Sequence, residues 1–239
     1  MNKNKIFRIA MAALLVVLSI AGTSMAYFTD VQEATNVFTA GNVDITLTEA
    51  KVVKNATTGN IEVVTGGDAG RVDAVNFDYG TTYGGLFPGQ SIYKDPTITN
   101  VGSETAYVGA IVTITNDDAI NADANIAKAL TTPSAITGFI TGLTESGKVV
   151  NYADIKTGDV TTGYTVYILF NDAVAKNGTA KLFSGIEIPE EWDNDEMANC
   201  KGLNIIVKAY ATQKAGFTDA VTAIKAAFPT EWTAFTANP

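Results

Sequence analysis

Histidine is absent from the 239-residue chain, and its absence removes whole classes of chemistry. A Ser-His-Asp or Cys-His arrangement needs an imidazole base and cannot be built here. Zinc sites that depend on histidine ligands, including the His-Glu-x-x-His motif, are excluded as well. The commonest hydrolytic active sites are therefore excluded. Catalysis by carboxylates, lysines or tyrosines remains chemically available. We expect a protein with no enzyme activity, no catalytic residue, no metal and no other cofactor.

Cysteine is almost absent too, because Cys200 stands alone in the chain. A single cysteine forms no intramolecular disulfide, so the fold must be held together by its hydrophobic core. Cys200 precedes an apolar, strand-like pattern. We therefore expect it to be a small half-buried residue rather than a reactive thiol.

Long hydrophobic runs are scarce, and the clearest one lies at the N-terminus over residues 9–20. Three basic residues and no acidic one precede it, and the small residues Ser24 and Ala26 follow at the positions that a signal peptidase reads. The run is shorter than the roughly 20 residues of a membrane span. We predict that residues 1–26 are a signal peptide cleaved between Ala26 and Tyr27, with a retained N-terminal anchor as the alternative.

Cleavage would leave residues 27–239 as one domain, with 13 basic and 25 acidic residues and a net charge of about −12. Such an acidic surface repels nucleic acid and anionic lipid and favours solubility. No second apolar stretch is long enough to span a membrane. We therefore expect a secreted protein of the extracellular matrix or cell surface that meets signal peptidase during export and binds no nucleic acid.

Apolar and polar residues alternate with a period of two in many segments, which is typical of half-buried strands. The segments expected to be strands are 42–48, 61–65, 71–79, 91–99, 106–115, 163–170, 179–188 and 203–212. Pro96 lies inside one of them and suggests an edge or a bulge. We predict an all-β fold: an antiparallel two-sheet jelly-roll sandwich with short helices in the connections.

Three regions depart from this pattern. Residues 117–163 begin rich in alanine and are expected to be a variable insertion, with one helix at 121–130 and a second helix or loop at 134–143. The acidic segment 190–199 can form a short helix. Near the C-terminus, Thr218 is a plausible N-cap for a helix. Its apolar face would carry Val221, Ile224 and Phe228 at helical spacing, and Pro229 would end it.

Three stretches together resemble the TasA and camelysin family of secreted biofilm-matrix fibre proteins, of the type that a dedicated signal peptidase exports. The first stretch reads AYFTD at residues 26–30 and NVFTAGNVDI at 36–45, and it is the most specific. The second reads FPGQ at 87–90 and KDPTITNVGS at 94–103. The third covers 182–186, 192–194 and 202–213. The resemblance is thin over residues 117–163.

This resemblance implies a jelly-roll subunit that polymerises with copies of itself by donor-strand exchange, in a Gram-positive biofilm matrix or on a cell surface. The mature N-terminal segment, residues 27–40, would leave its own subunit and complete a sheet in the next one. The donor-strand anchors would be Tyr27, Phe28, Val31, Val37 and Phe38. An accessory or anchoring matrix protein is a further expected partner. Cleavage at Ala26 would free the donor strand from its membrane tether.

Several alternatives stay open. The N-terminal segment can pair with its own sheet, as a first strand usually does, and the protein can be a monomeric adhesin or ligand-binding sandwich. A camelysin-like peptidase has no support from the residues. The oxygen-rich run 193–196 suits calcium, but it lacks the spacing of an EF-hand loop and fits a helix start, with Asp193 or Asn194 as cap. Trp192, Trp232 and Phe235 are expected to be packing residues.

Overall fold

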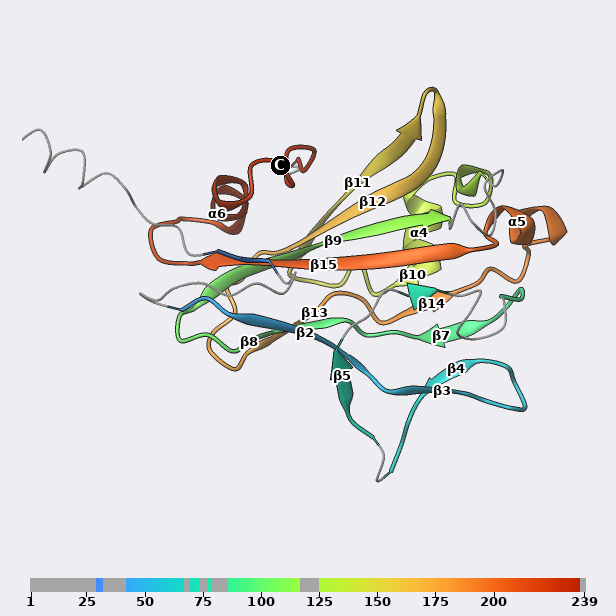
Figure 1. Cartoon of the computed structure of the whole chain (residues 1–239), viewed down its shortest axis with the longest axis horizontal. Coiled ribbons are helices and arrows are strands. Elements are labelled where there is room, and N and C mark those ends of the chain that lie inside the picture. The colour runs from blue at the N-terminus through green and yellow to red at the C-terminus, as the bar shows by residue number, and fades with distance from the viewer. Residues whose placement is uncertain are drawn as a thin grey trace, which may run out of the picture.

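The computed structural model describes residues 29–31, 42–66, 69–73, 77–78, 86–116 and 125–236. These residues form two layers of β-strands with short helices at the ends and on one outer face (Figure 1). The prediction of a mostly β fold is confirmed. The strands belong to three sheets rather than two, however, because one of the two layers is interrupted.

The large sheet forms one layer, in the order β1-β15-β9-β12-β11, with β6 also paired to β15. All of its strand pairs are antiparallel. The strands are β1 (Thr29–Val31), β6 (Phe77–Asp78), β9 (Ala106–Asn116), β11 (Lys148–Thr157), β12 (Val160–Phe170) and β15 (Leu203–Gln213). The central position predicted for the apolar segment 106–115 is confirmed, because β9 lies between β15 and β12. Strand β11 was not predicted and lies within the expected insertion.

The second layer consists of two smaller sheets, in the orders β13-β8-β2-β5 and β10-β14-β7-β4-β3. Their strands are β2 (Ile45–Ala50), β3 (Val52–Lys54), β4 (Ile61–Val63), β5 (Arg71–Asp73), β7 (Ser91–Tyr93), β8 (Thr97–Asn100), β10 (Ile140–Thr141), β13 (Thr179–Lys181) and β14 (Gly185–Glu187). Among the strand pairs described in this layer, β4 and β7 form the one parallel pair. We call these two sheets together the split layer.

The split layer is interrupted where two predicted strands each break in two. Segment 91–99 forms β7 and β8, and segment 179–188 forms β13 and β14. The register continues across the break, because Thr179 lies opposite Thr99 and Gly185 lies opposite Tyr93. Pro96 lies in the gap, where it has no N–H to donate, but its carbonyl accepts the Leu182 N–H at 2.9 Å.

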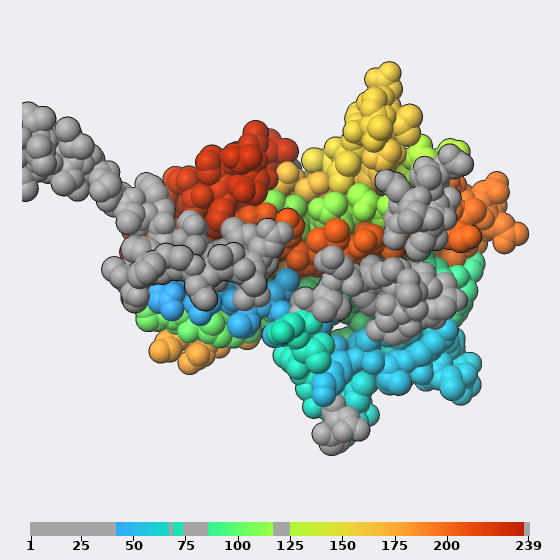
Figure 2. Space-filling view, in the orientation of Figure 1, coloured from blue at the N-terminus to red at the C-terminus, as the bar shows by residue number. Residues whose placement is uncertain are grey.

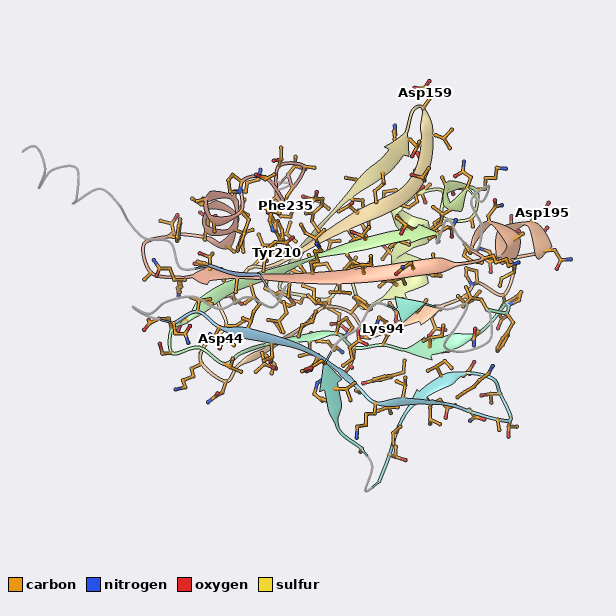
Figure 3. The ribbon with its side chains drawn as sticks, viewed as in Figure 1. Asp44, Lys94, Asp159, Asp195, Tyr210 and Phe235 are labelled. Atoms are coloured by element: carbon orange, nitrogen blue, oxygen red, sulfur yellow. The ribbon has the colours of Figure 1, made fainter. Side chains whose placement is uncertain are left out.

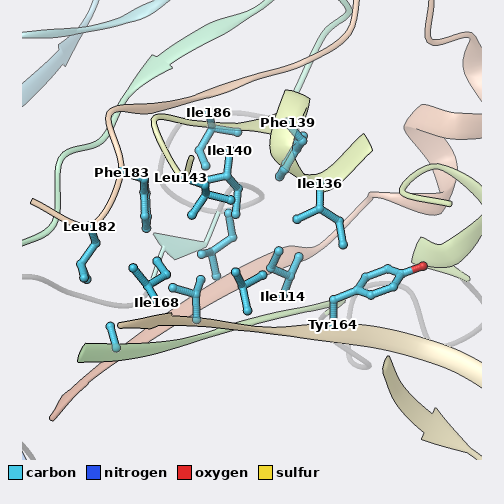
Figure 4. Close-up of a cluster of buried hydrophobic side chains, with 14 of the residues drawn as sticks. Ile114, Ile136, Phe139, Ile140, Leu143, Tyr164, Ile168, Leu182, Phe183 and Ile186 are labelled. Atoms are coloured by element: carbon cyan, nitrogen blue, oxygen red, sulfur yellow. The ribbon is translucent and has the colours of Figure 1, made fainter. Parts of the chain in front are cut away.

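The main hydrophobic core fills the space between the two layers. Ile114, Tyr164 and Ile168 point from the large sheet toward the chain segments of the split layer (Figure 4). The buried helix residues Ile136 and Phe139 of α4 (Pro133–Phe139) close one end of this core. Phe139 also stacks on Trp192, with ring centroids 6.0 Å apart. Two-sided packing of this kind explains why the fold needs no disulfide, and Cys200 is itself buried.

The short helices only partly follow the sequence expectations. Helix α5 (Asn194–Asn199) is capped by Asp193, and α6 (Ala220–Ala227) is capped by Asp219 rather than by Thr218. The cap prediction for Thr218 was wrong because the Asp219 carboxylate, one residue later, accepts the Thr222 N–H at 2.8 Å. The helix predicted at 121–130 is a 3-10 turn, η1 (Ile126–Lys128), within the part of that segment that the structure describes.

Candidate functional site

One side edge of the large sheet holds the beginning of the described chain. Thr29 lies opposite Thr212, and Val31 lies opposite Tyr210, in antiparallel register along β15. In Figure 1, β1 is the short blue strand beside the red end of β15. The pairing covers three residues of an eleven-residue strand, and β6 pairs with two residues at the other end of β15. We call this side of β15 the β15 edge.

An aromatic cluster fixes the β15 strand at the point where β1 pairs with it. The Tyr210 ring meets the rings of Phe228 and Trp232 at centroid distances of 5.0 and 5.8 Å. Tyr210 lies under the C-terminal segment in Figure 3. We call helix α6 and residues 228–236 the C-terminal cap, because they cover this half of the sheet's outer face. The predicted packing roles of Trp232 and Phe235 are confirmed, since both are fully buried.

Most of the predicted site residues lie outside the described part of the chain. These are the cleavage-site residues Ala26 and Tyr27 and the donor-strand anchors Phe28, Val37 and Phe38. Val31 is described through its backbone, in β1. For residues 29–31 the structure therefore describes the self-paired arrangement that the sequence left open.

The opposite side of the sandwich carries a cleft that the sequence did not reveal. Strand β13 pairs with β8 on one side, and its other side faces a cleft of about 440 Å³. We call this the β13 cleft. It is lined by Phe170, Ala173, Val174, Thr179 and Lys181, with Lys148 and Glu145 at one end. A pattern of alternating residues predicts that a strand exists, but it does not predict which side of the strand stays open.

A small charge network closes one end of the β13 cleft. The Lys148 ammonium donates to the carbonyls of Gly142 and Leu182 at 2.8 and 3.1 Å and to Glu145 at 3.1 Å. Burial lowers the pKa of Lys148, and Glu145 partly opposes this. The hydrogen bond from Lys148 lowers the pKa of Glu145. Since these three hydrogen bonds engage the Lys148 ammonium, the residue links neighbouring chain segments and is not placed to act as a nucleophile.

Two ion pairs hold the split layer together at its break. Lys94 is almost fully buried and donates to Glu49 at 2.5 Å, whereas Arg71 donates to Asp95 at 2.8 Å. Burial lowers the pKa of Lys94, and the Glu49 carboxylate opposes that shift. The Asp95 carboxylate also accepts the Ala50 N–H at 2.8 Å. Lys94 lies below the large sheet in Figure 3, between β7 and β8 in the chain, and its partner Glu49 lies on β2. These contacts are structural, because each group is satisfied by its partner.

The acidic run near residue 195 behaves as a helix start, as expected. Asp193 accepts the Asp195 N–H at 2.7 Å, and Glu196 accepts the Asp193 N–H at 3.0 Å, which completes a capping box. Hydrogen bonding lowers the pKa of Asp193. Burial raises the pKa of the Cys200 thiol to about 12, so this thiol is unreactive near neutral pH.

The described residues do not fit a metallopeptidase centre. They contain no group of three or more cysteine, aspartate or glutamate residues that could hold a metal ion. The whole chain also lacks histidine, the usual ligand of catalytic zinc. No helix in the described ranges is long and apolar enough to cross a membrane.

Comparison with known proteins gives one match. No curated protein and no solved structure matches the chain significantly. Residues 2–68 match the family model described as "Camelysin metallo-endopeptidase". The matched region contains β1 and the strands β2, β3 and β4. Over this N-terminal region the chain is similar to the camelysin/TasA family, which supports the resemblance seen in the sequence.

Proposed function

We propose that the chain is a secreted structural subunit of an extracellular fibre or biofilm matrix, and that its mature N-terminal segment assembles the fibre by donor-strand exchange. The observation that carries this proposal is the pairing of β1 at the β15 edge. The first described strand of the chain is an edge strand, and its described pairing is only three residues long. Such a strand can leave its own sheet at little cost.

The energetics of exchange follow from conservation of contacts. A segment that leaves its own subunit and pairs in a neighbour loses and regains main-chain hydrogen bonds of the same kind. Exchange of an element between copies is therefore inexpensive, and protein concentration decides which state is populated. When the donor edge and the acceptor edge are different surfaces, the contact does not close and a filament grows.

The N-terminal sequence supports export and gives cleavage a role in assembly. A donor strand with a free end at Tyr27 can reach a neighbouring subunit, whereas one attached to the apolar run 9–20 stays at the membrane. Signal peptidase would thus both release and activate the subunit. The two-layer sandwich fits a jelly-roll path, and an accessory matrix protein would anchor the fibre.

The first test compares two purified forms, one starting at Tyr27 and one lacking residues 27–38. We expect concentration-dependent fibres in electron micrographs from the first form and monomers from the second. The shorter form must keep the thermal unfolding transition of the longer one, because the β9-β12-β15 centre of the sheet does not depend on β1. If the full mature form stays monomeric at every concentration, the protein is a monomeric adhesin or ligand-binding sandwich instead.

A second form of the same test blocks cleavage. A bulky residue in place of Ala26 removes the small side chain that signal peptidase requires at this position. We expect the precursor to remain cell-associated and unassembled. Normal fibres from a chain shown by N-terminal sequencing to retain residues 1–26 would refute the role assigned to cleavage.

A further inference from the structure

We propose that the β13 cleft is the acceptor site of the fibre, and that it binds the N-terminal segment of a second copy of this chain. This inference rests on the proposed function and identifies the surface that receives the donor strand. It differs from a simple swap, in which the segment would return to the β15 edge of a neighbour.

The backbone of β13 is oriented to accept another strand. The Asn100 N–H donates to the Gly178 carbonyl at 3.0 Å, and the Leu182 N–H donates to the Pro96 carbonyl at 2.9 Å. In an antiparallel pair, the residues that bond to the partner alternate with residues whose N–H and C=O groups point away from it. Ala180 therefore bonds toward β8, while Thr179 and Lys181 direct their N–H and C=O groups toward the cleft.

The two edges of the sandwich are not equivalent. The β15 edge already carries β1 and β6. At the β13 edge, by contrast, β8 is the one strand paired with β13 within the described ranges. An unpaired edge with space beside it is a template for an incoming strand. The cleft supplies that space, because Thr179 and Lys181 both line it.

The chemistry of the cleft matches the proposed occupant. Phe170, Ala173 and Val174 provide an apolar wall for the aromatic and aliphatic residues of the segment. Residues 27–40 contain Asp30 and Glu33 and no basic residue, so the segment is acidic. Lys148 and Lys181 line the cleft together with Glu145 and Asp172, and Lys181 lies 3.9 Å from Glu145, so the charges of the lining balance. The apolar wall, rather than charge attraction, therefore supplies the match to this acidic segment.

The positions of the two edges produce an open-ended assembly. Strand β1 is at one end of the strand order in the large sheet and β11 is at the other. The β13 cleft lies on the β11 side, since residues at the start of β11 and the end of β12 line it. When the β15 edge of one copy faces the β13 cleft of the next, residues 27–41 have to cross only the interface between these two copies. Extended, these residues span up to about 50 Å, which is ample.

The first experiment locates the donor strand in fibres of the unaltered mature chain. Isotope-labelled and unlabelled copies are mixed, assembled, treated with a short amine-reactive cross-linker and digested for mass spectrometry. The α-amine of Tyr27 is the sole primary amine of residues 27–40. We expect links between differently labelled copies from this amine to Lys181, which lines the cleft, or to Lys176, which lies five residues before it in the chain.

The outcomes separate this inference from the proposed function. Links from Tyr27 to Lys208 or Lys214 at the β15 strand, in fibres of normal appearance, would overturn the β13 acceptor and leave donor-strand exchange standing. An absence of fibres would overturn both. The native Cys200 does not interfere, because the linker reacts with amines.

The second experiment tests the backbone of β13 directly. The double variant Thr179→Pro/Lys181→Pro removes two N–H groups that face the cleft and do not serve the β8 pairing, and proline is tolerated on edge strands. We expect at least a tenfold loss of fibre yield with an unchanged monomer unfolding temperature. The matched control, Thr179→Ala/Lys181→Ala, keeps both N–H groups and should keep most of the yield. Equal yields from the proline variant and the wild type would refute the site.

Discussion

The two layers of this sandwich differ in the length of their strands. In the large sheet, β9, β12 and β15 each run for eleven residues. In the split layer, the longest described strand is β2, with six residues. The large sheet is buried on both faces where the C-terminal cap covers its outer side. The split layer is buried on one face and is interrupted by Lys94, Asp95 and Pro96.

This difference shows how packing on a second face lets a strand continue. Residues 106–110 of β9 are all buried, whereas burial alternates beyond Ile111, where the cap no longer covers the sheet. The apolar residues gained on the second face offset the backbone entropy of a longer strand. In the largely exposed arm formed by β3, β4 and β5, each strand has three residues. The partly exposed β11 still reaches ten residues because it pairs along its length with β12. Figure 2 shows this arm projecting below the sandwich.

Removing Trp232 should produce the largest loss of stability, because it is the centre of the C-terminal cap. Its ring is fully buried and packs against Tyr167, Tyr210 and Phe235 at 5.6, 5.8 and 5.2 Å. We expect Trp232→Ala to lower the free energy of unfolding by about 4 kcal/mol, measured by urea denaturation. Glu231→Ala, at the exposed neighbouring position, should change it by less than about 0.5 kcal/mol. A cost below about 1 kcal/mol for Trp232→Ala would mean that the cap does not stabilise the sheet.

The same contrast explains what could be predicted from the sequence. Strands β9 and β15 were predicted almost to their ends, since β9 is apolar on both faces and the residues of β15 alternate between apolar and polar. The division of 91–99 into β7 and β8 was missed, because the pattern of side chains does not show that Lys94 finds Glu49 inside the core. The division of segment 91–99 depends on contacts between residues that are distant in the sequence. The open edge of β13 depends on such contacts as well, so neither feature can be predicted from the local pattern. For the N-terminal segment, the resemblance to a family rather than the residue pattern pointed to Val31. Whether this segment pairs with its own sheet was left open.

Breaking the Lys94–Glu49 pair should have the next largest effect, and it tests why the split layer is interrupted. Lys94→Met leaves the Glu49 carboxylate without its partner in a largely buried site, which should cost about 3 kcal/mol. The double variant Lys94→Met/Glu49→Leu removes both charges and should recover most of that loss. Denaturant unfolding of both single variants and the double variant measures the coupling. If the double variant is as unstable as Lys94→Met, the charges are not what holds this junction, and packing of the lysine stem is.

The smallest expected effect concerns Asp219, which caps the helix that fastens the second face of the large sheet. Hydrogen bonds from the Thr222 N–H and hydroxyl hold the pKa of Asp219 below its ordinary value. A carboxyl whose pKa is lower in the folded state stabilises the fold above its unfolded pKa, and this contribution disappears as the pH falls through the folded value. We expect Asp219→Ala to cost about 1 kcal/mol near neutral pH and progressively less in acid.

Asp219→Asn separates the cap from its charge, because asparagine caps a helix about as well as aspartate. This variant should keep most of the stability at neutral pH and lose the acid dependence. Asp193→Ala is the matched comparison, since Asp193 caps α5, which has no buried residue. Its effect should be smaller than that of Asp219→Ala in the same urea titrations. Equal losses from the two helices would contradict the view that α6 matters because it covers the large sheet, and would assign both effects to the local cap alone.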